Sequence, residues 1–183
     1  MLIFERLNPL NAKYLVDFLI NNQDVGTFFQ PHPFTKEAIA HILDSRKEDE
    51  FIVMRLNDKG YLGGVIGYGL LRGWDEGYER PSLGITVDKN YRGEGYGKRM
   101  MEYLHQLARE HGATEVRLTI EKENVVARNF YKGMGYKFHA WDNEKDEGVC
   151  SRHSGQTCQT RSGTCQRFSK APNLFLLTVE TLP

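Results

Sequence analysis

The fold of this chain is decided by residues 86–99, which read TVDKNYRGEGYGKR. They predict a β-strand, then a turn rich in glycine and cations, then the start of a helix. The first N–H groups of a helix have no partner inside the helix, and the helix dipole adds partial positive charge behind them. Such a turn suits a phosphate or pyrophosphate group. It therefore predicts a protein that holds a phosphorylated cofactor.

Composition sets the broad class of the protein. The chain has 183 residues, which suits one domain with a real core, and its 24 basic and 24 acidic residues cancel. This balance counts against a nucleic-acid partner. The sequence has no apolar run as long as a membrane span, and residues 1–6 predict a first strand rather than a signal peptide. We therefore expect a cytoplasmic protein with no nucleic-acid or membrane partner.

Outward from the glycine turn, hydrophobic period and turn residues predict the other elements. Strands are predicted at residues 1–6, 51–56, 61–71, 83–87, 116–120, 136–141 and 173–179. Helices are predicted at residues 10–22, after the N-cap Thr35, from the glycine turn to His111, and at 125–134. Hairpin strands followed by alternating strands and helices predict a single domain over residues 1–183. Its sheet is expected to be mixed α/β, with helices on both faces.

The glycine turn matches neither of two familiar nucleotide fingerprints. A dinucleotide fingerprint needs a third glycine where this chain has Lys98, and a Walker loop needs Ser or Thr where it has Arg99. What remains is the pattern Arg-x-x-Gly-x-Gly, formed by Arg92, Gly95 and Gly97. Taken alone this pattern is weak, because a plain glycine-rich loop explains it as well.

A second motif lies about a helix and a strand downstream, where residues 124–136 read NVVARNFYKGMGY. The two motifs together, from about Leu83 to Phe138, resemble the GCN5-related N-acetyltransferase (GNAT) family. The resemblance implies the acyl-CoA N-acyltransferase fold, of the α/β (α+β) class. That fold has a mixed, mostly antiparallel central sheet that splays at the cofactor strand and is flanked by about four helices.

The resemblance also implies acetyl-CoA as co-substrate. In the family the glycine loop holds the pyrophosphate, the preceding strand offers backbone groups to pantetheine, and the Asn-x-x-Ala-x-x-x-Tyr helix lies beside the thioester. Carried onto this chain, the cofactor-binding set is Ile85, Val87, Arg92, Gly93, Glu94, Gly95, Tyr96, Gly97, Lys98, Asn124, Ala127 and Tyr131. Asn124 has a second interpretation as a simple helix N-cap.

The reaction implied is direct attack of an amine on the thioester. Tyr131 matches the family tyrosine that protonates the leaving thiolate, and its alternative role is to pack on the cofactor. An ammonium of pKa about 10.4 must first lose a proton, so a carboxylate base is expected. We name Glu79 as the candidate base; Asp75, Glu76 and Glu121 are the other carboxylates considered.

The acceptor side is suggested by an aromatic and proline-rich segment, with Phe29 and His32 as candidates, and by Trp74 and Tyr78 on a later turn. These surfaces suit a small-molecule amine such as an amino sugar. The alternatives are a protein or peptide N-acetyltransferase, a transferase of longer acyl groups, and a CoA-binding sensor without turnover. A homodimer is a further expectation, because family members often dimerise.

A polar insert is predicted at about residues 142–170, between the last two strands, and it departs from the family pattern. It holds Cys150, His153, Cys158 and Cys165. Four such side chains have the chemistry of a tetrahedral zinc site, although their spacing matches no standard zinc knuckle. A flexible loop without metal is the preferred interpretation.

Overall fold

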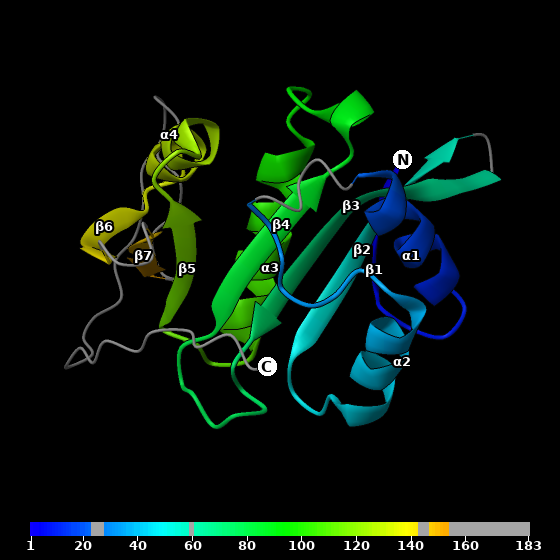
Figure 1. Ribbon diagram of the computed structural model, residues 1–183, viewed down its shortest axis with the longest axis horizontal. Helices are drawn as coiled ribbons and strands as arrows, with labels where there is room; N and C mark the ends of the chain where they lie inside the picture. Colours follow the sequence, from blue (N-terminus) through cyan, green and yellow to red (C-terminus); the bar gives the residue numbers. More distant parts are fainter. Residues whose placement is uncertain (23–27, 59–60, 143–146, 154–183) are drawn as a thin grey trace.

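A seven-stranded sheet organises the computed structural model, which describes residues 1–22, 28–58, 61–142 and 147–153. The strand order is β1-β2-β3-β4-β5-β7-β6 (Figure 1). The strands are β1 Leu2–Arg6, β2 Glu50–Asp58, β3 Tyr61–Arg72, β4 Ser82–Val87, β5 Glu115–Glu121, β6 Lys137–Asp142 and β7 Glu147–His153. Neighbouring strands pair antiparallel except for β4 and β5, which are parallel. The predicted mixed, mostly antiparallel sheet is confirmed.

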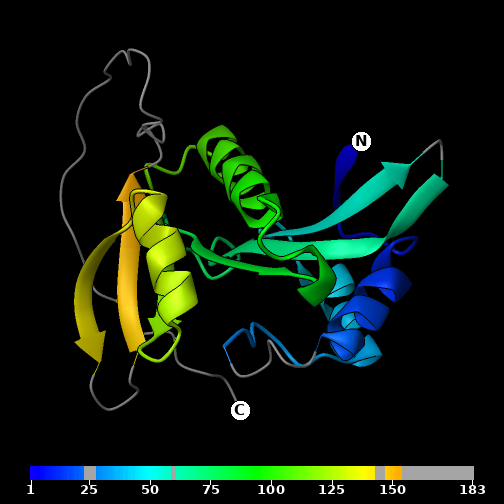
Figure 2. The same ribbon diagram turned by 90° about the horizontal axis from the view of Figure 1, so that it is seen from above.

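Helices cover both faces of the sheet, as the sequence predicts (Figure 2). One face carries α1 (Ala12–Asn21) and α2 (Lys36–Ser45), which pack on β2 and β3 in one hydrophobic cluster. The other face carries α3 (Tyr96–Glu110) and α4 (Val125–Gly133), whose buried residues share a second cluster with β4 and β5. None of the helices in the described ranges is both long and apolar enough to cross a membrane.

Local signals explain the helix boundaries. Thr35 caps α2, because its side chain accepts a hydrogen bond from the N–H of Ala38 at 3.2 Å. On α3 the buried side chains recur at helical spacing and form the stripe that faces the sheet. The stripe comprises Met100, Met101, Leu104, His105, Leu107 and Ala108. The helix ends at Glu110 with His111 as its C-cap, and Gly112 follows with a φ of 79°, a conformation that glycine adopts without steric cost.

The structure corrects the predicted insert in one respect. Residues 147–153 form β7, which pairs with β5 from Glu115↔His153 to Glu121↔Glu147 and with β6 on its other side. A strand between two partners is held by backbone hydrogen bonds on both edges, so a polar sequence can occupy it. The rest of the insert and the strand predicted at 173–179 lie outside the described residues.

Close packing between β3 and α3 gives a stability prediction. A Cβ at Gly69 would lie 2.8 Å from Met100 Sδ and 2.9 Å from Leu104 Cδ1, whereas one at Gly64 of the same strand meets nothing within 4 Å. We expect Gly69→Ala to lower the free energy of unfolding by about 1–2 kcal/mol through overpacking. Gly64→Ala is the matched control and should leave it nearly unchanged. Urea unfolding of both variants measures the difference, and equal losses would contradict the prediction.

Candidate functional site

The glycine turn connects β4 to α3. It begins with a short 3-10 helix, Lys89–Tyr91, capped by Asp88, and continues through Gly93 and Gly95. These two glycines have φ angles of 82° and 85°, in the left-handed region that other residues adopt only with strain. A Cβ at either position would meet nothing within 4 Å, so open space lies in front of the turn. A ligand can therefore approach the backbone here.

The N-terminus of α3 opens onto the same space. Gly95 is its N-cap and provides no side-chain hydrogen bond, and the first turn of the helix has no acidic residue. The N–H groups of Tyr96, Gly97 and Lys98 thus have no intrahelical acceptor, and no carboxylate lies within the first helical turn. This is the arrangement that binds phosphate at helix ends.

Cations border the turn, but two of them already have partners. Arg92 is exposed, and its Nε donates to the carbonyl of Val87 at 3.0 Å. The Nζ of Lys98 lies 3.9 Å from Oε1 of Glu102, and both side chains are about half exposed. Glu94 is exposed as well. Both cations are thus at the turn, and each is engaged by a group of this chain.

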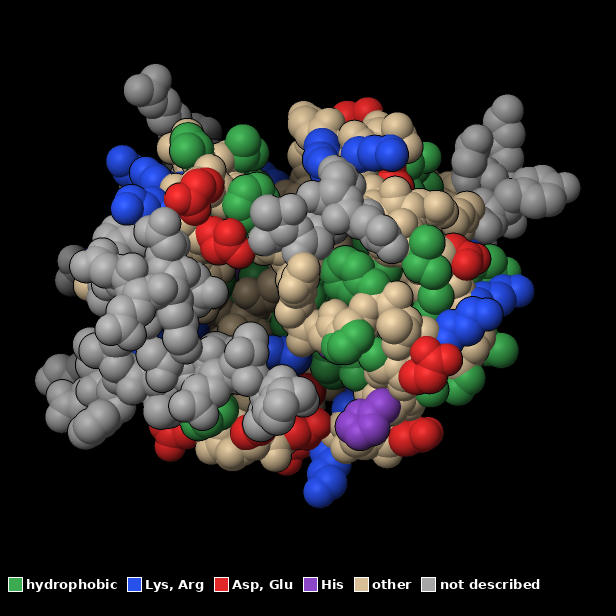
Figure 3. Space-filling model, in the orientation of Figure 1, with side chains coloured by type: hydrophobic (Ala, Val, Ile, Leu, Met, Phe, Trp, Pro, Cys, Tyr) green, Lys and Arg blue, Asp and Glu red, His purple; other side chains and the backbone are tan. Residues whose placement is uncertain are grey.

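β4 and β5 separate as they approach the glycine turn. Among the described residues, Ser82↔Arg117 is the single register pair between them, supported by the N–H of Arg117 donating to the carbonyl of Pro81 at 3.0 Å. Figure 1 shows the two strands diverging from that point, and Figure 3 shows the surface hollowed in the same region. Along Leu83–Val87 no other described strand pairs with the edge of β4 that faces β5, although the Val87 carbonyl on it already accepts from Arg92. The splayed cofactor strand is where the sequence predicts it.

α4 lies on the far side of this separation. Asn124 is its N-cap, and Oδ1 of that side chain accepts from the N–H of Ala127 at 3.1 Å. The capping interpretation of Asn124 is thus observed, and the oxygen is engaged. Its Nδ2 amide is a donor that this cap does not use.

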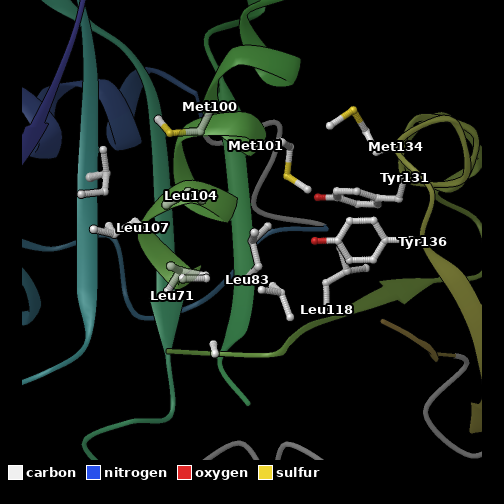
Figure 4. Packing of buried hydrophobic residues seen from close by; sticks show 14 of the residues in the cluster. Leu71, Leu83, Met100, Met101, Leu104, Leu107, Leu118, Tyr131, Met134 and Tyr136 are labelled. Carbon is white, nitrogen blue, oxygen red and sulfur yellow. The ribbon is translucent and has the colours of Figure 1, made fainter. Parts of the chain in front are cut away.

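Tyr131 belongs to the core beneath α4. It is 8% exposed and packs against the rings of Phe130 and Tyr136, with centroids 5.3 and 5.5 Å away. Figure 4 shows its hydroxyl directed, together with that of Tyr136, toward Met101 and Leu83. The phenol therefore projects from α4 into the region between α4 and the β4–α3 unit. Its ring packs in the core, and its hydroxyl faces this region.

Sequence reasoning missed a buried pair beside Tyr131. The hydroxyl of Tyr136 and Nε2 of His105 lie 3.0 Å apart, and each residue is 4% exposed. Burial, with the charges of Arg152 and Arg109, lowers the pKa of His105 to about 4, so the imidazole is neutral near pH 7. The sequence feature that could have revealed this pair is the position of His105 among the apolar residues of the α3 stripe.

The face of the sheet under α1 and α2 carries a second polar group of residues. Nε2 of His32 lies 2.9 Å from the hydroxyl of Tyr68, and Nδ1 of His32 lies 2.9 Å from the carbonyl of Pro33. Since a carbonyl only accepts, Nδ1 carries the proton and the phenol donates to Nε2. Burial, together with the charge of Arg72, lowers the pKa of His32 and favours this neutral form. Phe29 packs edge-on against Tyr68 and over Gly84 of β4.

The other predicted acceptor residues lie elsewhere. Trp74 stacks on His111 at the end of α3, with centroids 4.5 Å apart, and packs with the cluster on the α3 face. Tyr78 and Glu79 are exposed on the loop that enters β4, the end opposite to the glycine turn (Figure 1). The structure brings Phe29 and His32 together, but it does not bring Trp74 and Tyr78 to them.

Asp75, one of the carboxylates considered as a base, has a structural role. Its side chain accepts hydrogen bonds from the N–H groups of Lys47 and Glu48 at 3.0 and 2.7 Å. In turn, Oδ1 of Asp49 accepts from the N–H groups of Gly73 and Trp74, each at 2.9 Å. These contacts fix the 73–81 loop against the start of β2.

The candidate zinc ligands cannot be assembled from the described part of the chain. Cys150 and His153 lie on β7, whereas Cys158 and Cys165 fall outside the described residues. Within the described ranges there is no group of three or more His, Cys, Asp or Glu side chains placed to hold a metal ion.

Two solved structures that share this fold carry the name acetyltransferase. An acetyltransferase of the GNAT family from Streptococcus pneumoniae superposes with a TM-score of 0.68 and 19% identity, covering 84% of this chain and 99% of that one. The PaiA N-acetyltransferase from Thermoplasma acidophilum, solved in complex with coenzyme A, superposes with a TM-score of 0.66 and 15% identity over 84% and 99% of the two chains. At this level of identity, these similarities show the fold.

Sequence relatives act on different amines. The spermine/spermidine N(1)-acetyltransferase of Bacillus subtilis is 31% identical over 85 residues, 44% of this chain and 56% of that protein. The catalytic subunit naa20 of the N-terminal acetyltransferase B complex of Schizosaccharomyces pombe is 31% identical over 84 residues, 46% of each chain. The chain thus matches about half the length of these curated relatives. The family model described as acetyltransferase (GNAT) family matches residues 18–136, more than half of the chain, and the protein belongs to that family.

Proposed function

We propose that the protein is an N-acetyltransferase that moves the acetyl group of acetyl-CoA to a primary amine of a small molecule, such as an amino sugar. The observation that carries this proposal is the separation of β4 from β5 beside the open glycine turn. A long, thin ligand with a phosphate end fits such a cleft, with its pyrophosphate at the turn and its arm along the free edge of β4.

Donor binding rests on the chain's own backbone. The N–H groups at residues 93–98 would hold the pyrophosphate, with Arg92 and Lys98 adding charge. The edge of β4 at Ile85 and Val87 would pair with the amide groups of the pantetheine arm, and Nδ2 of Asn124 and the α4 surface at Ala127 would contact the same arm from the opposite side. Each charge-assisted contact contributes about 1.5–3 kcal/mol.

The bound co-substrate supplies an acetyl thioester. A backbone N–H on the free edge of β4 is suited to hold the carbonyl oxygen while charge develops on it. Tyr131 is the proposed general acid, and its phenol delivers a proton to the thiolate as the carbon–sulfur bond breaks and the new carbon–nitrogen bond forms. The proton that the amine loses goes to a base or to water.

Glu79 remains the proposed base. Its position on the exposed loop at the entrance to β4 means that it would act through water rather than by direct contact. The acceptor would enter over the face that carries Phe29 and His32, since Phe29 covers β4 at Gly84 and His32 contacts Tyr68 on the neighbouring strand.

A thiol-release assay tests the function. The purified protein and acetyl-CoA are offered amino sugars, polyamines and short peptides with free N-termini, with succinyl-CoA and longer acyl-CoAs as competing donors. Transfer to small amines supports the proposal, and transfer confined to peptides supports the protein N-acetyltransferase alternative. Binding of acetyl-CoA in calorimetry without thiol release from any amine would support a sensor and contradict the proposal.

Gly97→Ala separates cofactor contact from folding. A Cβ at this helical position would lie 3.6 Å from Phe130 and 3.8 Å from Ile85, which is ordinary contact, so the fold accepts it. Alanine should raise the free energy of unfolding by about 0.5–1 kcal/mol, because glycine is the poorer helix former. The same methyl group should weaken acetyl-CoA binding, measured by calorimetry, by about tenfold if the cofactor approaches this backbone. Unchanged affinity would contradict the proposed placement.

A further inference from the structure

Arg72, at the end of β3, is a cation without a counter-ion in the described part of the chain. Its Nη1 donates to the carbonyl of Pro31 at 2.5 Å, which draws the guanidinium under the segment that leads into α2. Its Nε is buried and has no hydrogen-bond partner among the described residues, and no described carboxylate forms an ion pair with it. A desolvated charge without a partner is costly unless a ligand supplies one.

Thr86 presents a second unsatisfied group on the same face. It is 5% exposed, and its Oγ1 has no hydrogen-bond partner among the described residues. Thr86 lies directly opposite Tyr68 in the β3–β4 register, so the two side chains share one face of the sheet. Along β3 the side chains of Tyr68 and Arg72 also fall on one face, because they are four residues apart.

The two groups mark the ends of one strip. Between them β3 and β4 pair Leu70 with Gly84, and the ring of Phe29 lies over Gly84, 3.0 Å from where its Cβ would be. The strip thus has a hydroxyl near the C-terminal end of β4, an apolar centre, and a guanidinium at its other end. It runs away from the β4 edge to which the thioester is assigned.

The charge along this strip is positive. Arg72 and Arg46 both act on the Tyr68 hydroxyl, and Arg72 acts on His32. The Tyr68 hydroxyl is committed to His32, and Arg46 donates to the carbonyl of Leu7. Arg72 is therefore the group with unused capacity to bind an anion.

We propose that the acceptor is an amine that also carries an anionic group, a carboxylate or a phosphate, which pairs with Arg72 while the amino group lies by Thr86. This inference rests on the proposed acetyl transfer and specifies its substrate class. It sets the protein apart from the relatives named for spermine, because a second ammonium group would be brought toward Arg72 and repelled.

Matched amines test the inference. Lysine is compared with cadaverine, which lacks only the carboxylate, and glucosamine 6-phosphate with glucosamine; spermine is the polycation. In the thiol-release assay the member with the anionic group should, in at least one pair, have a kcat/KM about tenfold or more above that of the member without it. The pair that responds identifies carboxylate or phosphate as the recognised group.

Variants assign that preference to Arg72. Arg72→Gln should lower kcat/KM by about 10–100-fold for the amine with the anionic group and by less than about threefold for the matched amine without it. Arg72→Lys should keep part of the preference, because the charge remains. Arg109→Gln is the matched control, because it removes an exposed arginine on α3. It should leave kcat/KM unchanged for both members of the pair. Thermal unfolding of each variant checks that it is folded.

The outcomes separate this inference from the proposed function. Transfer to the amines without an anionic group, or to spermine, with equal or greater efficiency and unchanged in Arg72→Gln would overturn the inference and leave acetyl transfer supported. If no amine is acetylated, calorimetric titration of the same pairs into the protein with CoA gives a second readout. Tighter binding of the amine with the anionic group, lost in Arg72→Gln, would then support the strip as a binding site. Equal binding of both amines of a pair, or no binding of either, would overturn the inference.

Discussion

Replacing Tyr131 by phenylalanine should lower kcat for acetyl transfer by about 100-fold or more, while the KM for acetyl-CoA changes little. General acids contribute about 10²–10⁴-fold to catalysis, and this substitution removes only the proton donor. The ring would stay in place, because its contacts with Phe130 and Tyr136 are made by carbon atoms. Steady-state thiol release with a saturating amine measures the effect.

The matched control is Tyr136→Phe, which removes a buried phenol at similar depth. Tyr136 bonds to His105 and is assigned no part in the reaction, so its kcat should fall by less than about threefold even if stability drops. An unchanged kcat in Tyr131→Phe would contradict the acid assignment and leave Tyr131 as packing. Equal losses in both variants would indicate a general loosening of the core under α4.

The elements around the glycine turn could be predicted because their signals are local. Thr35 caps its helix through its own side chain, and Gly93 and Gly95 adopt the positive φ that their turn requires. The position of the β4–β5 separation followed from the family resemblance, and the single register pair at Ser82 confirms it. These features depend on neighbours in sequence or on a motif that specifies the fold.

What the sequence did not reveal depends on contacts between distant residues. His105 is an ordinary member of a helical stripe until Tyr136, 31 residues away, is placed beside it. Trp74 looked like an acceptor contact, but His111 provides its stacking partner on the other face of the sheet. Arg72 reads as a strand-end arginine, and only its cross-sheet surroundings reveal the unused Nε. Polar composition likewise concealed β7, whose partners are β5 and β6.

The buried His105 should make stability fall as the solution becomes acidic. Its pKa in the folded protein is about 4, against 6.5 for an unperturbed histidine, so the folded state binds fewer protons than the unfolded state between these values. The contribution is fully present above pH 6.5 and is lost as pH falls toward 4. At 1.36 kcal/mol per unit, the free energy of unfolding should drop by about 3 kcal/mol over this range on account of His105. Urea unfolding at a series of pH values measures the slope.

His105→Gln isolates this contribution from the other titrating groups. Glutamine keeps a polar atom for the Tyr136 hydroxyl but does not titrate. Between pH 6.5 and 4, the free energy of unfolding of this variant should therefore fall less steeply with decreasing pH, by the contribution of about one proton. His41→Gln, on the exposed surface of α2, is the control and should keep the slope of the parent protein. If His105→Gln and the parent protein lose stability in parallel, then His105 takes up its proton without unfolding and the neutral buried imidazole is wrong. His105 contacts Tyr136, and Tyr136 packs on Tyr131. If the predicted loss of stability at low pH is confirmed, kcat and the tertiary structure should therefore be lost with the same midpoint pH.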